Sequence, residues 1–171
     1  GAESAVVVVG ADAGVQIETI KVWRRLDQVA KPRVVFINKM DKEHADFDKA
    51  LNSLRERFKV NFVPLTIPMG AAASFEGVVD LLSMRAFKGT TSGDIPAAAR
   101  EAADEAHMAV IEAAADGEDR LMEKYLSEEK LSDVEIRRGL RSALAAGKCV
   151  PVFCGAALQD TLKIARRRVG C

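Results

Sequence analysis

A short apolar run that ends in a polar loop constrains the fold of this chain more than any other feature. Residues 33–37, Arg-Val-Val-Phe-Ile, have the length and β-branched content of a buried strand, and Asn38-Lys39-Met40-Asp41 follows them. A helical pattern comes next, with Asp46 as a candidate N-cap and a single apolar stripe formed by Phe47, Leu51, Leu54 and Phe58. Loops at the carboxyl ends of parallel strands are where α/β proteins bind ligands. The sequence therefore predicts an α/β fold with a ligand site directly after this strand.

The side chains of this loop match the hydrogen-bonding edge of guanine. The Asp41 carboxylate can accept two hydrogen bonds, from the ring N1–H and from the exocyclic amine, and adenine offers no matching pair of donors. The stem of Lys39 can lie flat along the base, and the Asn38 amide can hold the loop in place. Each charge-assisted bond in a partly dry pocket contributes roughly 1.5–3 kcal/mol. The alternative is a solvated polar loop that binds no ligand, and these four residues alone do not separate the two interpretations.

A second loop strengthens the guanine interpretation. The apolar segment Cys149-Val150-Pro151-Val152-Phe153 predicts another strand, and it runs into Cys154-Gly155-Ala156-Ala157. A turn of small residues lets backbone N–H groups approach the carbonyl oxygen O6 of a base. We expect the amide of Ala157 to be that donor.

The other expected elements make up a parallel sheet with an α+β insertion. A fully apolar strand runs from Ser4 to Gly10, as parallel sheets require. The further elements expected are a helix at 16–28, a strand at 62–67, one or two strands at 75–87, helices at 96–115, 118–126 and 133–146, and a return strand at 149–154. The predicted apolar stripe of the first helix is Ile17, Ile20, Val22, Trp23 and Leu26, and that of the long helix is Ala98, Ala102, Ala106, Ala109, Val110 and Ala113.

Taken together, these segments resemble the middle of the GTPase domain of bacterial translation elongation factor G, over about residues 5–160. The matching segments are Ala13-Gly14-Val15-Gln16, residues 35–41, Ala45-Asp46-Phe47, residues 63–70, residues 75–81, residues 121–126 and residues 152–157. The resemblance implies the second half of a P-loop-GTPase-type parallel sheet with an α+β inserted subdomain. It divides the chain into residues 1–63 of the GTP-binding domain, an insert at 64–148, a return strand with the second guanine loop at 149–161, and a divergent tail at 162–171 that we expect to be disordered.

The phosphate-binding half of such a domain has no counterpart in the 171 residues. There is no Gly-x-x-x-x-Gly-Lys-Ser/Thr segment, and no Asp is followed by Gly three residues later. The resemblance places both motifs upstream of Gly1, so we expect an internal fragment of a larger protein. The groups that position phosphate and Mg²⁺ would then be absent, and the chain alone is predicted not to hydrolyse GTP.

The resemblance also implies the function of the parent protein, a GTP-driven translocation factor that acts on the ribosome and uses GTP, GDP and Mg²⁺. Within this chain the implied guanine-binding residues are Asn38, Lys39, Asp41, Gly155, Ala156 and Ala157. In the family a Ser usually stands where this chain has Ala156, so a supporting hydroxyl is missing. The insert would contact the stalk protein of the large ribosomal subunit, with its long helix and the acidic residues Glu101, Asp104, Glu105 and Glu112. Two alternatives remain open: a non-catalytic stalk-binding module, and a fragment of a related release-factor or ribosome-protection GTPase.

Composition limits the other partners. The chain has 25 basic and 25 acidic residues, so a net charge of zero argues against nucleic-acid binding by its own field. No apolar run approaches the ~20 residues that span a membrane. The three cysteines form neither a disulfide framework nor a metal-binding spacing, which fits a reducing cytoplasm. The apolar strand from Ser4 to Gly10 would lie at an uncovered sheet edge, which predicts self-association.

Four further residue types invite a functional interpretation, and for each we expect a structural role. His44 and His107 have no implied partner and are predicted to be surface groups. Trp23 and Tyr125 are expected to pack in the core or between helices. Cys154, beside the second loop, is expected to be a small buried thiol rather than a reactive one.

Overall fold

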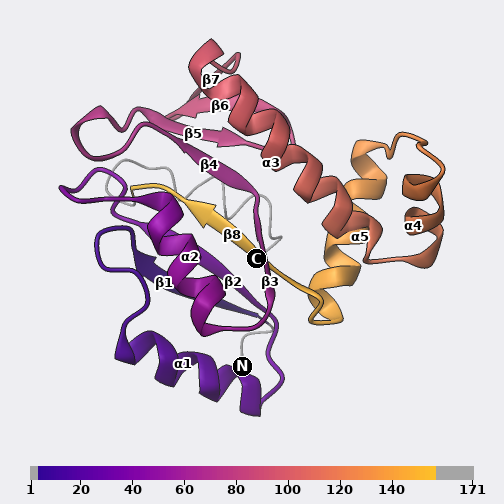
Figure 1. Ribbon diagram of the computed structural model, residues 1–171, viewed down its shortest axis with the longest axis horizontal. Helices are drawn as coiled ribbons and strands as arrows, with labels where there is room; N and C mark the ends of the chain where they lie inside the picture. Colours follow the sequence, from indigo (N-terminus) through magenta and orange to yellow (C-terminus); the bar gives the residue numbers. More distant parts are fainter. Residues whose placement is uncertain (1–3, 157–171) are drawn as a thin grey trace.

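Residues 4–156 are described by the computed structural model, and within them the strands form two sheets (Figure 1). The first sheet is parallel, with the strand order β1-β2-β8-β3. Its strands are β1 (Ala5–Gly10), β2 (Arg33–Asn38), β3 (Asn61–Pro64) and β8 (Cys149–Cys154). The second sheet is antiparallel and consists of β4 (Thr66–Met69), β5 (Gly77–Asp80), β6 (Arg85–Lys88) and β7 (Thr91–Gly93). The predicted α/β class, with a parallel sheet and an additional α+β unit, is confirmed.

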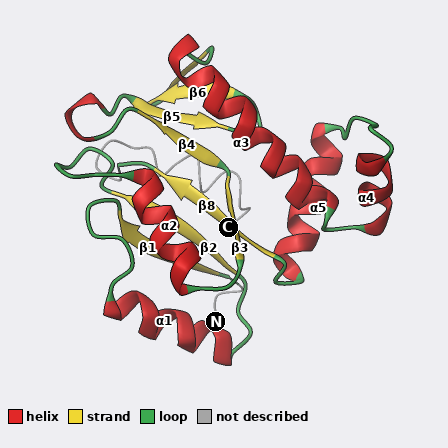
Figure 2. Cartoon of the chain, in the orientation of Figure 1, coloured by secondary structure: helices red, strands yellow, loops and turns green. Residues whose placement is uncertain are grey.

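The helices divide between the two sheets, as Figure 2 shows. Helices α1 (Ile17–Gln28) and α2 (Phe47–Arg57) lie on one face of the parallel sheet. Helix α3 (Ala97–Ala115) extends from the antiparallel sheet to α4 (Asp119–Leu126) and α5 (Asp133–Ala145). A short 3-10 turn, η1 (Ala72–Ser74), lies between β4 and β5. No helix within residues 4–156 is both long and apolar enough to cross a membrane.

Large apolar side chains join α1 and α2 to the parallel sheet. Val35 and Ile37 of β2 point into this core, and Leu54 of α2 is fully buried against it. The ring of Trp23 stacks on Phe58 with centroids 4.1 Å apart, which confirms the expected packing role of Trp23. The opposite face of β2, with Phe36, belongs to a second core that the antiparallel sheet and the helices α3 and α5 share.

The strand predicted at 62–67 is in fact two strands in two sheets. Residues Asn61–Pro64 pair with β8, whereas Thr66–Met69 pair with β5. Leu65 connects them: its N–H donates to the Val152 carbonyl at 2.8 Å, and its own carbonyl accepts from Leu81 N–H at 3.0 Å. The apolar run is continuous in sequence because both sheets bury it, so the pattern gave no sign of the break.

Two predicted helical stripes are wrong in part. In α1, Ile17 and Val22 are exposed, and Trp23 is the buried apolar residue. In α3, Ala98, Ala102 and Ala109 are exposed, whereas the buried residues include Ala103, Val110, Ala113 and Ala114. Alanine occupies almost every face of α3, so its spacing carries little information about which face is buried. The predicted tail at 162–171 lies outside the described residues.

Candidate functional site

The carboxyl ends of β1, β2 and β8 meet at one edge of the parallel sheet. Gly10 is in register with Asn38, and Ile37 is in register with Cys154. The two loops expected to recognise guanine therefore leave neighbouring strands. They are also bonded to each other, because Gly155 N–H donates to the Ile37 carbonyl at 3.0 Å and Met40 N–H donates to the Gly155 carbonyl at 3.2 Å.

Met40 anchors the first loop. Its side chain is fully buried, and its carbonyl accepts a hydrogen bond from Ala72 N–H at 2.8 Å. Lys39 has a φ of 65°, a conformation that is uncommon for a residue with a side chain and that recurs at ligand-binding sites. The Lys39 carbonyl accepts from Lys42 N–H at 3.1 Å and closes the turn. The backbone of the loop is therefore held at Met40, while the flanking Lys39 is exposed and Asp41 is half-buried.

The Asp41 carboxylate lies at the surface of this loop but is largely shielded. Its side chain is 19% exposed, and Oδ2 lies 3.9 Å from the Nζ atom of Lys42. A carboxylate that is partly desolvated yet reachable suits a ligand that donates two hydrogen bonds.

Asp12 belongs to this edge and was not anticipated from the sequence. Its Oδ2 lies 3.6 Å from Lys39 Nζ, so an acidic group from the β1 loop faces the lysine of the β2 loop. Gly10 leaves space for the Asp12 carboxylate in this position, because a Cβ at residue 10 would lie 2.4 Å from Oδ1 and the carboxylate would have to move. The available signal was topological: if β1 and β2 are parallel neighbours, the residues after Gly10 must lie beside those after Asn38.

The second loop is well packed where it is described. Ala156 is 1% exposed, and Cys154 is buried. Burial raises the pKa of the Cys154 thiol to about 12, against a smaller lowering by its hydrogen bond with Thr66. The prediction of a small buried thiol is confirmed. Ala157, the expected O6 donor, lies outside the described residues.

The two histidines are not alike. His44 is exposed, as predicted, with its ring 3.6 Å from the Glu43 carboxylate. His107 is half-buried, and its Nδ1 lies 2.8 Å from the Leu81 carbonyl, so the prediction of a surface group is wrong. This contact joins α3 to the residue that follows β5, and it gives His107 a packing role in the insert. Within residues 4–156, no three His, Cys, Asp or Glu side chains come together as a metal site would require.

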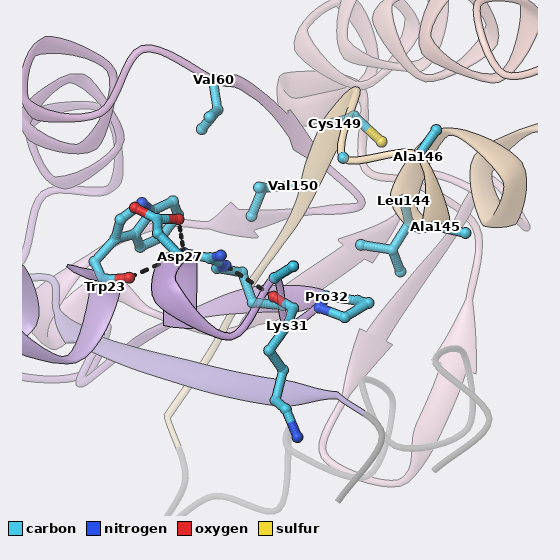
Figure 3. Close-up of a pocket in the computed structure, with 13 residues that line it drawn as sticks. Trp23, Asp27, Lys31, Pro32, Val60, Leu144, Ala145, Ala146, Cys149 and Val150 are labelled. Atoms are coloured by element: carbon cyan, nitrogen blue, oxygen red, sulfur yellow. Dashed lines mark hydrogen bonds and ion pairs between the residues drawn. The ribbon is translucent and has the colours of Figure 1, made fainter. Parts of the chain in front are cut away.

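A cleft of about 330 Å³ lies at the other end of the parallel sheet, where β2 and β8 begin (Figure 3). Trp23 and Asp27 of α1 line one side, and Leu144 and Ala145 of α5 line another. Between them the Arg33 guanidinium stacks over the Trp23 ring at 4.7 Å and pairs with Asp27 at 2.7 Å. These polar groups satisfy one another, and the cleft is separated from the two loops expected to recognise guanine by the length of the strands.

Comparison with known proteins agrees with this geometry. The family described as the elongation factor Tu GTP binding domain matches residues 1–165. Among solved structures, the protein described as ttk003000868 from Thermus thermophilus is similar with a TM-score of 0.86 and 26% sequence identity. That match covers 97% of this chain and 26% of the Thermus chain, so this chain spans about a quarter of the protein it matches. The chain belongs to the family of elongation factor Tu GTP-binding domains, whose members bind guanine nucleotides.

Proposed function

We propose that this chain is the guanine-recognition part of a translational GTPase of the elongation factor G type. The observation that carries the proposal is the hydrogen bond from Met40 N–H to the Gly155 carbonyl, 3.2 Å long. It holds the Asn38-Lys39-Met40-Asp41 loop against the turn of small residues that begins at Gly155. A base between the two loops would meet a carboxylate on one side and backbone amides on the other.

Each residue has a defined part in this recognition. Asp41 accepts hydrogen bonds from the N1–H and the exocyclic amine of guanine, and its partial burial strengthens both. The Lys39 stem lies along the base, with its ammonium oriented by Asp12. Asn38 supports the loop, and the Gly155-Ala156-Ala157 backbone faces O6.

The sequence indicates which parts of nucleotide binding this chain can supply. The 171 residues contain no Gly-x-x-x-x-Gly-Lys-Ser/Thr segment, so this chain offers base contacts without the phosphate cradle. We therefore expect a dissociation constant for GDP weaker than ~0.1 mM and no hydrolysis of GTP by the chain alone. Phosphate and Mg²⁺ binding, and the action on the ribosome, would belong to the complete protein.

Exchanging Asp41 for asparagine tests the proposal. In a protein that joins this chain to a phosphate loop, Asp41→Asn should weaken GDP binding by on the order of 10²–10³-fold, because two charge-assisted bonds are lost. Binding of XDP should improve, since xanthine carries a carbonyl at C2 to which the Asn amide can donate. Asp48→Asn, on the exposed surface of α2, is the matched control. An unchanged ratio of GDP to XDP affinity would show that Asp41 does not read the base.

A second function, as a stalk-binding module, is favoured by the surface of the insert. Glu101, Asp104, Glu105 and Glu112 are all exposed on α3. We propose that this acidic face binds the stalk protein of the large ribosomal subunit. Pull-down of that protein by the wild-type chain, lost when Glu101, Asp104 and Glu105 are changed to Gln together, would support the module. Equal capture by both forms would exclude this face.

Self-association through β1 is a further proposal about partners. Within the described residues β1 is an edge strand, with Val6 60% and Val8 56% exposed. An open, apolar strand edge is a template for pairing with another copy. Val8→Lys should therefore reduce the dimer fraction in light scattering, whereas Ile17→Lys on exposed α1 should not. Val7→Lys is unsuitable, because Val7 is buried and the change would unfold the sheet. A wild-type chain that stays monomeric at millimolar concentration would contradict the proposal.

A further inference from the structure

Thr66 connects the antiparallel sheet to the end of β8. It is the first residue of β4, is 1% exposed, and is 88 residues from Cys154 in sequence. Its Oγ1 accepts the N–H of Cys154 at 2.8 Å and lies 3.5 Å from the Cys154 sulfur. That sulfur in turn lies 3.6 Å from the Thr66 carbonyl oxygen. Both the backbone and the side chain of the last residue of β8 are therefore fixed by this threonine, from the strand beside it (Figure 1).

The Thr66 hydroxyl lies beside the last residues of β8, where the neighbouring strand β3 has already ended. On one side β8 pairs with β2 as far as Cys154, but on the other its pairing with β3 ends at Val152, opposite Pro64. Backbone N–H groups alternate between the two sides of a strand, so Cys154 N–H faces the side that β3 no longer covers. A buried N–H without an acceptor is costly, and the Thr66 side chain supplies the acceptor that the next residue of β3 would have given.

Fixing Cys154 also fixes the two guanine loops. The next amide, Gly155 N–H, donates to Ile37, and the Gly155 carbonyl accepts from Met40 N–H. Met40 is itself bonded to the antiparallel unit, because its carbonyl accepts a hydrogen bond from Ala72 N–H. The loops thus lie between two attachments to the antiparallel unit, one at Thr66 of β4 and one at Ala72 of the turn η1. The side chain of Ala156 has no hydrogen-bonding group of its own with which to hold the second loop.

We infer that Thr66 is a positioning residue for guanine recognition: its hydroxyl sets the Gly155-Ala156 turn at the right place relative to Asp41. The inference rests on the proposed function, since it concerns how the same base is read. Thr66 touches no ligand itself and acts through Cys154 and Gly155.

A pair of substitutions separates positioning from packing. Thr66→Val keeps the shape of the side chain but removes the acceptor, whereas Thr66→Ser keeps the hydroxyl and loses a methyl group. Both should lower the overall stability, so stability alone does not distinguish them. In the 171-residue chain, amide hydrogen exchange at Cys154, Gly155 and Met40 should accelerate roughly tenfold in Thr66→Val relative to the amide of buried Leu51. In Thr66→Ser the same ratios should stay near those of the wild type.

Nucleotide binding gives the second readout. We expect an NMR titration with GDP to show affinity roughly three- to tenfold weaker in Thr66→Val and within about twofold of wild type in Thr66→Ser. Thr91→Val, at an exposed position of β7, is the control and should match the wild type. Equal exchange and equal GDP affinity in the Val and Ser variants would overturn the inference.

Failure of the inference about Thr66 can be distinguished from failure of the proposed function. If GDP binds the wild type and Asp41→Asn abolishes binding while Thr66→Val leaves it unchanged, guanine recognition stands and the role of Thr66 is refuted. If the wild-type chain shows no GDP-dependent shift up to about 10 mM, its affinity lies within the weak range already expected, and guanine recognition is decided by Asp41→Asn in a protein that joins this chain to a phosphate loop. The exchange ratios would then still decide whether the Thr66 hydroxyl holds the loop.

Discussion

The helices of this molecule are packed by two different means. On the parallel sheet, α1 and α2 bring large rings and branched side chains together, with Trp23 and Phe58 stacked at 4.1 Å and Leu54 fully buried. In the insert, α3 and α5 approach so closely that backbones touch. A Cβ at Gly139 of α5 would lie 2.1 Å from the Ala114 carbonyl oxygen, and one at Gly117 would lie 2.0 Å from the Gly139 carbonyl oxygen.

The two interfaces should respond differently to changes in volume. An interface of large side chains derives its stability from buried apolar area, at roughly 1.5–3 kcal/mol for a fully buried Leu or Phe, and loses it when atoms are removed. An interface of small residues has little area to lose but no room for added atoms. Deletions should therefore be most damaging between the parallel sheet and the helices α1 and α2, and additions most damaging in the insert.

Removing a large side chain from the first interface should have the largest effect. Leu54→Ala should lower the free energy of unfolding by about 2–5 kcal/mol, because Leu54 is 0% exposed and a cavity would remain. Leu126→Ala, on α4, removes the same atoms from a residue that is 73% exposed and should change stability by less than about 0.5 kcal/mol. Urea denaturation of both variants measures the difference. Similar losses in the two would mean that burial does not set the stability of this layer.

Adding volume to α3 is the complementary change. Ala103 is fully buried and its neighbour Ala102 is exposed, so the two positions form a matched pair. Ala103→Leu should cost about 1–3 kcal/mol by overpacking, whereas Ala102→Leu should be within about 0.5 kcal/mol of wild type. The urea midpoints of the two variants measure the difference. The stripe expected from the sequence placed Ala102 in the core, whereas the structure places Ala103 there. A larger loss of stability in Ala102→Leu than in Ala103→Leu would mean that the stripe expected from the sequence is the buried one.

Gly139 tests whether backbone contact outweighs helix propensity. Within a helix, Gly→Ala ordinarily adds about 1 kcal/mol of stability. Here the new Cβ would meet the carbonyl of Ala114, so we expect a net loss of about 1–2 kcal/mol. Gly93→Ala is the control, because a Cβ there meets nothing within 4 Å. If the midpoint temperature of thermal unfolding is higher in Gly139→Ala than in wild type, α3 and α5 can move apart at little cost in free energy.

The same contrast explains what the sequence could predict. Rings and branched side chains stand out against polar neighbours, so Trp23 and Leu54 were placed correctly. Alanine gives no such contrast in α3, and the predicted stripe was wrong in part. The two loops proposed to recognise guanine were identified from residues adjacent in sequence, whereas the contacts of Asp12 and Thr66 depend on which strands are neighbours. The contact of Thr66 with Cys154 spans 88 residues, and the switch of the chain between sheets at Leu65 had no local sign.

Lowering the pH should destabilise the insert, by a smaller amount than the substitutions above. In the insert, the Glu135 carboxylate accepts from Lys124 Nζ of α4 at 2.9 Å and from Ser132 N–H at 2.9 Å. The bond with Lys124, followed by the Ser132 bonds, lowers the pKa of Glu135 from 4.5 to about 2. The folded state therefore binds a proton at this group less readily than the unfolded state does. Its contribution to stability is complete above pH 4.5 and is lost as the pH falls toward about 2.

Glu135→Gln isolates this contribution, because the amide still accepts from Ser132 but carries no charge for Lys124. Urea midpoints measured between about pH 6 and about pH 2 should fall less steeply in Glu135→Gln than in wild type, with the two curves converging at the acid end. Glu112→Gln, on the exposed face of α3, should leave the slope unchanged. If the wild-type and Glu135→Gln curves run parallel, the contact between α4 and α5 does not depend on this charge. The small apolar residues of the insert would then have to stabilise it without help from the ion pair.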